Sequence, residues 1–67
     1  MKYVQVTSRA VILDHVNSQK SVVAVENVSM ISLESDKNGL YRVWLNGNWI
    51  DVDRADQQKI LRAMGLT

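Results

Sequence analysis

The chain has 67 residues, with eight basic and seven acidic side chains and a formal net charge of +1. A chain this short encloses too little volume for two packed domains or for the deep cleft that most enzymes need, and it has no cysteine for disulfides or thiolate-bound metals. With 46% hydrophobic and 22% charged residues, the composition predicts one folded domain over residues 1–67.

Charge and hydropathy also limit the partners. The nearly even balance of charges disfavours a dedicated duplex-binding protein, which usually has a clear basic excess. No apolar run approaches the ~20 residues of a membrane span. The first residues contain no apolar signal-peptide core, so we expect a cytoplasmic protein that does not associate with membranes.

The N-terminal half predicts short strands. Residues 2–7 alternate between apolar and polar side chains, which favours a strand. Residues 10–16 contain a β-branched apolar run that suits a strand or a short helix. We prefer a strand, because the polar residues 17–20 then form a hairpin loop that leads into a strand over residues 21–25.

Alternation returns over residues 30–35, which predicts a further strand. Residues 36–39 form a loop in which Gly39 supplies a positive φ. The strongest signal follows, because Asn46-Gly47 separates the alternating runs 40–45 and 48–52. This dipeptide is typical of a two-residue hairpin turn with positive φ at both positions.

The last segment predicts a helix over about residues 54–64. Asp53 can cap the amides of its first turn, and Gly65 follows where a left-handed terminating residue belongs. One narrow apolar stripe must dock on the sheet or on a partner, because a three-turn helix is marginal alone; its members are Ile60, Leu61 and Met64. Together these elements predict an α+β fold: a small, mainly antiparallel twisted sheet or open barrel of five or six short strands, with one C-terminal helix.

The register of the predicted hairpin separates two faces. A turn at Asn46-Gly47 places alternate residues on a core face, namely Tyr41, Val43, Leu45, Asn48, Ile50 and Val52. The opposite face carries four residues that we call the indole face: Arg42, Trp44, Trp49 and Asp51. It has Trp44 opposite Trp49, and Arg42 opposite Asp51.

Two interpretations of the indole face stay open. The tryptophans could clip the hairpin together, since a cross-strand aromatic pair contributes about 0.2–1 kcal/mol, or could supply core area in a chain without phenylalanine. Alternatively the face recognises a partner, because Trp, Tyr and Arg are over-represented at binding hot spots. Arg42 and Asp51 hold the face toward water, which favours the second interpretation.

Other residues give weaker signals for chemistry. Asp14 and His15 are neighbours, and on a strand they point to opposite faces, so they predict a surface pair and no acid–base couple. Asp51, Asp53 and Asp56 lack the glycine-bearing loop of a calcium site. We therefore expect no catalytic residues, no metal and no cofactor.

Residues 25–31, which contain Asn27-Val28 and Ile31, lead into the hairpin and helix. This order resembles two family patterns, the small flagellar-operon proteins of the swarming-motility type and the β-rich DNA-binding domain called LytTR. The resemblance covers about half of the chain and rests on residue types common in β-hairpins. No functional residue is carried over from it.

These observations predict a small non-enzymatic protein–protein interaction module, a regulator or inhibitor that occupies a partner protein. Stand-alone chains of this size are frequent in phages and other mobile elements, where such inhibitors are common. The alternative is a nucleic-acid-binding regulatory protein in which Arg42 and the two indoles stack on single-stranded bases. We also expect a homodimer, because few proline or glycine residues are available to protect a sheet edge.

Overall fold

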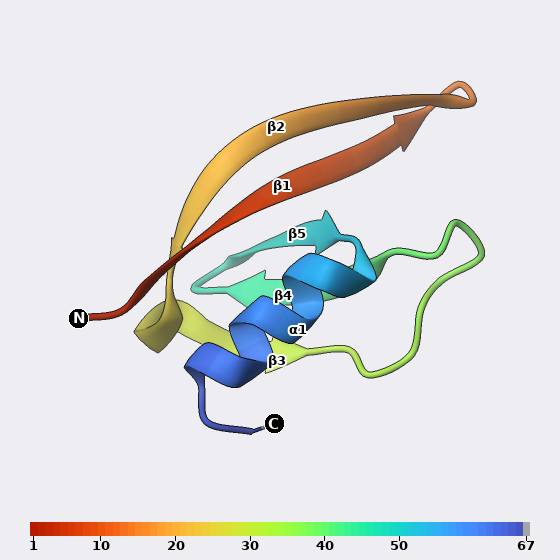
Figure 1. Cartoon of the computed structure of the whole chain (residues 1–67). Helices are drawn as coiled ribbons and strands as arrows, with labels where there is room; N and C mark the ends of the chain where they lie inside the picture. The colour runs from red at the N-terminus through yellow and green to blue at the C-terminus, as the bar shows by residue number, and fades with distance from the viewer. Residues whose placement is uncertain (67) are drawn as a thin grey trace.

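Two antiparallel sheets and one helix make up the chain in a computed structural model, which describes residues 1–66 (Figure 1). The first sheet pairs two long strands, and the second has the order β3-β4-β5. The predicted α+β class is therefore confirmed, with five strands and one helix. The elements in chain order are β1 (Tyr3–Ile12), β2 (His15–Ala24), the 3-10 turn η1 (Val25–Asn27), β3 (Val28–Ile31), β4 (Tyr41–Leu45), β5 (Asn48–Val52) and α1 (Arg54–Ala63).

Strands β1 and β2 form a long hairpin, which we call the arm, and its far end projects beyond the rest of the molecule (Figure 1). Its two-residue turn consists of Leu13 and Asp14, with φ of 50° and 64°. The predicted loop at residues 17–20 is wrong, because these residues lie inside β2. Residues 17–20 are exposed to solvent, so their polar character reflects exposure and does not indicate a turn.

The strand predicted over residues 30–35 is displaced. Strand β3 ends at Ile31 and does not span residues 30–35. Its ladder with β4 contains an irregularity between Val28 and Met30. Beyond β3 the backbone forms a loop instead, in which the Asp36 carboxylate accepts hydrogen bonds from the amides of Asn38 and Leu40.

The β4–β5 hairpin is confirmed residue by residue. Leu45 pairs with Asn48 next to the turn, and the ladder continues to Tyr41 opposite Val52. Gly47 has the predicted positive φ, 84°, whereas Asn46 does not, so the prediction of positive φ at both turn positions is wrong at Asn46. The sequence signal was sufficient here because turn length alone fixes the register of a hairpin.

The core lies where the base of the arm, the inner face of β4 and β5, and α1 meet. Its fully or nearly fully buried members come from all of these elements: Val6, Val23, Val43, Val52 and Ile60. Tyr41, Leu45 and Ile50 of the predicted core face and Met64 of the helix stripe pack against this cluster. The predicted docking of the helix on the strands is thus confirmed.

Both ends of α1 follow the prediction. The Asp53 side chain accepts a hydrogen bond from the amide of Asp56 (2.9 Å), which satisfies one of the free amides of the first turn. At the other end the amide of Leu66 donates to the carbonyl of Leu61, and the amide of Gly65 donates to that of Arg62. With φ of 78° at Gly65, this is a Schellman closure.

Side chains of α1 bind the edge of β1 that does not pair with β2. Asp56 Oδ2 accepts the amide of Thr7 (2.9 Å), and Lys59 Nζ donates to the carbonyl of Gln5 (2.9 Å). The Asp53 carboxylate pairs with Arg9 at 3.3 Å. We call this set of contacts the β1–α1 seam, because it joins residues that are 44 to 54 positions apart in the chain.

Shortening Ile60 tests the docking of the helix. Ile60 is fully buried, so Ile60→Ala should destabilise the fold by about 2–5 kcal/mol through lost burial and the cavity left behind. Chemical denaturation would measure the change. Arg62→Ala, an exposed position two residues away, is the control and should change stability by no more than about 0.5 kcal/mol. Equal effects of the two substitutions would contradict the docking.

Removing the carboxylate of Asp56 tests the seam. Asp56→Ala deprives the amide of Thr7 of its acceptor in a part-buried position and should cost about 1–3 kcal/mol. Amide hydrogen exchange should also quicken at Thr7. Substitution of Asp14, a carboxylate at the exposed arm tip, by Ala is the matched control. Unchanged exchange at Thr7 in the Asp56 variant would show that the seam does not hold β1.

Candidate functional site

The four residues of the indole face come together as the register requires. Arg42 lies opposite Asp51, and Trp44 lies opposite Trp49, on the side of β4 and β5 that faces away from the buried Val43 and Val52. All four predicted site residues thus share one surface.

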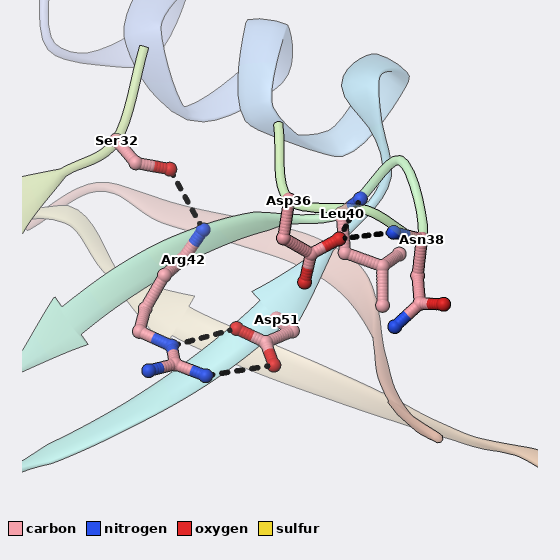
Figure 2. A network of polar contacts seen from close by, with 6 residues as sticks. All are labelled: Ser32, Asp36, Asn38, Leu40, Arg42 and Asp51. Carbon is pink, nitrogen blue, oxygen red and sulfur yellow. Dashed lines mark hydrogen bonds and ion pairs between the residues drawn. The ribbon is translucent and has the colours of Figure 1, made fainter. Parts of the chain in front are cut away.

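Arg42 links the charged and aromatic parts of this face. Its Nε lies 3.0 Å from Asp51 Oδ1, and its Nη2 lies 3.5 Å from Asp51 Oδ2 (Figure 2). Its guanidinium carbon also sits 4.9 Å from the centre of the Trp49 ring, which is cation–π distance. The hydrogen bond with Asp51 raises the pKa of Arg42 above its ordinary value, so the guanidinium stays charged.

The two indoles differ in exposure. Trp49 has 56% of its surface exposed, whereas Trp44 is half-buried. Trp49 is therefore not part of the core, and the face it lies on is open to solvent. A large exposed aromatic ring held by a cation on one side is available for contact with another molecule.

The backbone of Arg42 is fixed by the segment that follows β3. The Arg42 amide donates to Ser32 Oγ (2.9 Å), and the Arg42 carbonyl accepts from the Ser32 amide (2.9 Å). Figure 2 shows the contact with Ser32 Oγ beside the Arg42–Asp51 pair. Since the backbone groups of Arg42 point toward Ser32, those of the opposite residue, Asp51, point away from β4.

The loop after Ser32 carries a second ordered carboxylate. Asp36 Oδ1 accepts from the amides of Asn38 (2.7 Å) and Leu40 (3.0 Å), as seen in Figure 2. These two backbone hydrogen bonds lower the pKa of Asp36, and the Arg42 and Lys37 charges add to the effect. Gly39 has a φ of 77°, as the sequence predicted for this loop.

Two hollows flank the indole face. The arm hollow, of about 320 Å³, lies between Trp49, Ile50 and Asp51 of β5 and the middle of the arm. The loop hollow, of about 360 Å³, is lined by Trp44 and Asp51 and by six residues before and in β4, namely Ser32, Glu34, Ser35, Asp36, Leu40 and Arg42. Each tryptophan therefore forms a wall of one hollow, and Asp51 borders both.

The loop hollow has an acidic lining. Glu34, Asp36 and Asp51 contribute carboxylates, against the single guanidinium of Arg42. Asp51 is paired with Arg42, so Glu34 and Asp36 give this hollow an excess of negative charge. The arm hollow has a balanced charge, with Arg9 and the carboxylate of Asp51 beside uncharged serine, asparagine and glutamine side chains.

The other residues considered in the sequence have local partners or lie apart. Asp53 caps α1 and pairs with Arg9, and Asp56 binds the Thr7 amide, so neither lies on the indole face. Asp14 and His15 are exposed at the arm tip. Within residues 1–66 no three acidic or histidine side chains are grouped as a metal site would require.

Sequence reasoning missed the surroundings of the indole face. Ser32 and Asp36, which line the loop hollow, belong to a loop. Ser8, Arg9 and Gln19, which line the arm hollow, belong to the arm. One local signal existed: an aspartate closely followed by Asn-Gly is typical of a loop in which the carboxylate binds its own backbone. The contribution of the arm had no local signal, because it depends on tertiary packing.

No helix in the described part of the chain has the length and apolar character needed to cross a bilayer. Comparisons with protein-family models, with curated proteins and with solved structures found no match to this chain. The two family resemblances noted in the sequence therefore gain no support from them.

The ordered carboxylate of Asp36 predicts a dependence of stability on pH. Its pKa in the folded chain lies below the ordinary value of 3.8, so the folded state favours the ionised form. The stabilisation is fully present above pH 3.8 and is lost as the pH falls through the lower, folded-state pKa.

Chemical denaturation of the wild type and of Asp36→Asn at a series of pH values would measure this effect. The wild type should be the more stable of the two above pH 3.8, and its advantage should shrink below that pH. Asp14→Asn, at the arm tip, is the control. A difference between wild type and Asp36→Asn that is constant with pH would refute the assignment.

Proposed function

We propose that this chain is a protein-binding module whose indole face occupies the surface of a partner protein. The observation that carries the proposal is Trp49, an indole with 56% of its surface exposed that is nevertheless held in place by Arg42. Tryptophan and arginine are among the residue types most enriched at binding hot spots.

The face is preorganised for binding. The Arg42–Asp51 ion pair and the Arg42–Ser32 backbone contacts fix the guanidinium over the Trp49 ring before any partner arrives. Little side-chain entropy would be lost on association, and this loss is one of the main costs of forming a complex. The salt bridge itself is exposed, so we assign it a positioning role rather than a large share of affinity.

The two hollows define what the partner presents. An apolar side chain of the partner would contact the apolar part of the arm hollow, which consists of Ala10, Trp49 and Ile50. A lysine or arginine would enter the loop hollow, where Glu34 and Asp36 provide negative charge. The partner surface that fits is thus an apolar patch with a basic residue at its rim.

We further propose that binding, not catalysis, is the activity, and that the chain acts as a regulator or inhibitor by covering a surface of its partner. The alternative is binding of single-stranded nucleic acid, in which bases would stack on Trp49 and on Arg42. Glu34, Asp36 and Asp51 beside the stacking surface disfavour it, because phosphates would be repelled there.

The test begins with capture from native lysate by the immobilised full chain at high salt. One stoichiometric protein should be retained, then purified and titrated against the wild type and against Trp49→Ala. The substitution should weaken binding by about 2 kcal/mol or more, roughly thirtyfold in Kd, because it removes the central aromatic contact. Tryptophan emission of the wild type should shift to the blue when the partner covers the ring.

Leu33→Ala is the matched control, because Leu33 is also apolar and is 75% exposed but lies outside both hollows. It should leave Kd unchanged. The proposal fails if Trp49→Ala and Leu33→Ala behave alike. It also fails if the captured protein is absent and random single-stranded oligonucleotides quench the tryptophans with an affinity that falls steeply with salt, since that result establishes the nucleic-acid alternative.

A further inference from the structure

Strand β2 has one edge without a neighbour. Within the described residues its hydrogen-bonded partner is β1, and the ladder between them is regular over all ten residues of each strand. The amide of Thr7 and the carbonyl of Gln5 point away from β2, toward α1. Backbone groups alternate in direction along a strand, so the β2 residues opposite Gln5, Thr7 and every second residue after them have amides and carbonyls that point away from β1 into solvent. These residues are Val16, Ser18, Lys20 and Val22.

This edge lacks the features that usually prevent strand pairing. The chain has no proline, and the β1–β2 ladder has no bulge. Lys20 is the one residue of β2 that carries a full charge when His15 is neutral. A long, regular edge of this kind is an open template for another strand.

Exposed apolar residues collect at the two ends of the arm. Of the eleven large hydrophobic residues exposed in the described chain, seven lie in its first 22 residues. Val11, Ile12, Leu13 and Val16 form the tip, Met1, Tyr3 and Val22 lie near the base, and the middle of β2 is polar. An antiparallel partner of the same sequence would place tip against base and middle against middle.

We propose that two copies of this chain pair through β2, antiparallel about a two-fold axis at Gln19, to form a continuous four-stranded sheet of order β1-β2-β2-β1. The four edge residues of each copy would then share about eight backbone hydrogen bonds. A self-complementary edge of this kind closes into a dimer and leaves the outer edges of β1 bound to α1.

The side chains select this register. With the axis at Gln19, Val16 lies opposite Val22 of the partner subunit, and Ser18 lies opposite Lys20 of the partner subunit. A shift of the axis to Lys20 would put two ammonium groups directly opposite each other, which is destabilising. A shift to Ser18 would place Val16 opposite Lys20 of the partner subunit and separate the valines.

The favoured register also extends the apolar contacts of each arm. Val11 already pairs with Val16 across the arm. Adding Val22 of the partner subunit makes a row of three valines on one face, and symmetry makes a second row. These three valines are 39%, 58% and 65% exposed in the single chain, so pairing covers surface that is otherwise wet.

A cross-linking experiment tests the axis directly. The chain contains no cysteine, so a single introduced thiol reports on itself alone. In the proposed register Gln19 and its symmetry mate form a pair without mutual backbone hydrogen bonds, with Cα atoms about 4.5 Å apart, which suits a disulfide. Gln19→Cys should give a covalent dimer of the full chain on mild oxidation. Asn17→Cys should not, because its symmetry mate is about 13 Å away along the strand.

Two double substitutions that introduce charges test the proposed contact between Val16 and Val22 of the partner subunit. Val16→Lys with Val22→Lys puts like charges opposite each other twice and should raise the dimer Kd at least about tenfold, as measured by sedimentation. Val16→Lys with Val22→Glu changes the same two positions but restores attraction, and it should dimerise about as well as the wild type. Positions 16 and 22 of one copy are about 20 Å apart, so neither variant gains a close contact within its own chain.

The proposal is overturned if the wild type sediments at the 7.6 kDa of one chain throughout the micromolar range. It is also overturned if both double variants dissociate equally, or if Asn17→Cys cross-links as readily as Gln19→Cys. Circular dichroism of each variant would show whether the fold is kept, and the two cysteine variants still test the axis even if a double variant unfolds. The arm hollow shares Asn17, Ser18 and Gln19 with the paired strand, whereas Trp49 and Arg42 lie on the other sheet. Sedimentation and cross-linking report on the dimer, and the titration of Trp49→Ala against the partner reports on the indole face, so failure of one proposal is distinguished from failure of the other.

Discussion

The free edge of β1 is closed by side chains of the helix, and the rest of the structure depends on this seam. The arm and the β3-β4-β5 sheet are separate hydrogen-bonded units, so side chains must join them. Asp56 and Lys59 replace a neighbouring strand by binding the amide of Thr7 and the carbonyl of Gln5. The helix is itself positioned by the end of β5, because Asp53 is its cap. The valines of the core are enclosed only when these three units are held together.

Sequence reasoning succeeded where a local rule determines the geometry. Asn46-Gly47 fixed the turn, the turn fixed the register, and the register placed Arg42 and Asp51 on one face. It failed at the arm, because Leu13 and Asp14 adopt positive φ without the glycine or asparagine that normally announces such a turn. The seam had no local signal either, since its partners are about fifty residues apart.

The indole face illustrates the same division. The alternation of side chains along β4 and β5 determines which residues lie on the indole face. The charge and shape of its surroundings come from tertiary packing. The middle of the arm lines a hollow beside Trp49, and the loop around Asp36 adds carboxylates beside Trp44. Arg42 contacts the ring of its diagonal neighbour while it pairs with the residue directly opposite. A recognition surface of this kind can be located from sequence, whereas its charge and shape depend on the fold.

The contact between Lys2 Nζ and the carbonyl of Ala63 (3.2 Å) brings the beginning and the end of the fold together. Every strand is synthesised before α1, yet β1 lacks the acceptor for its outer amide until α1 is present. During translation the arm can form early, because its contacts are local, whereas the core stays incomplete until the helix leaves the ribosomal tunnel. Nascent chains of this protein would therefore expose the apolar base of the arm until α1 has emerged.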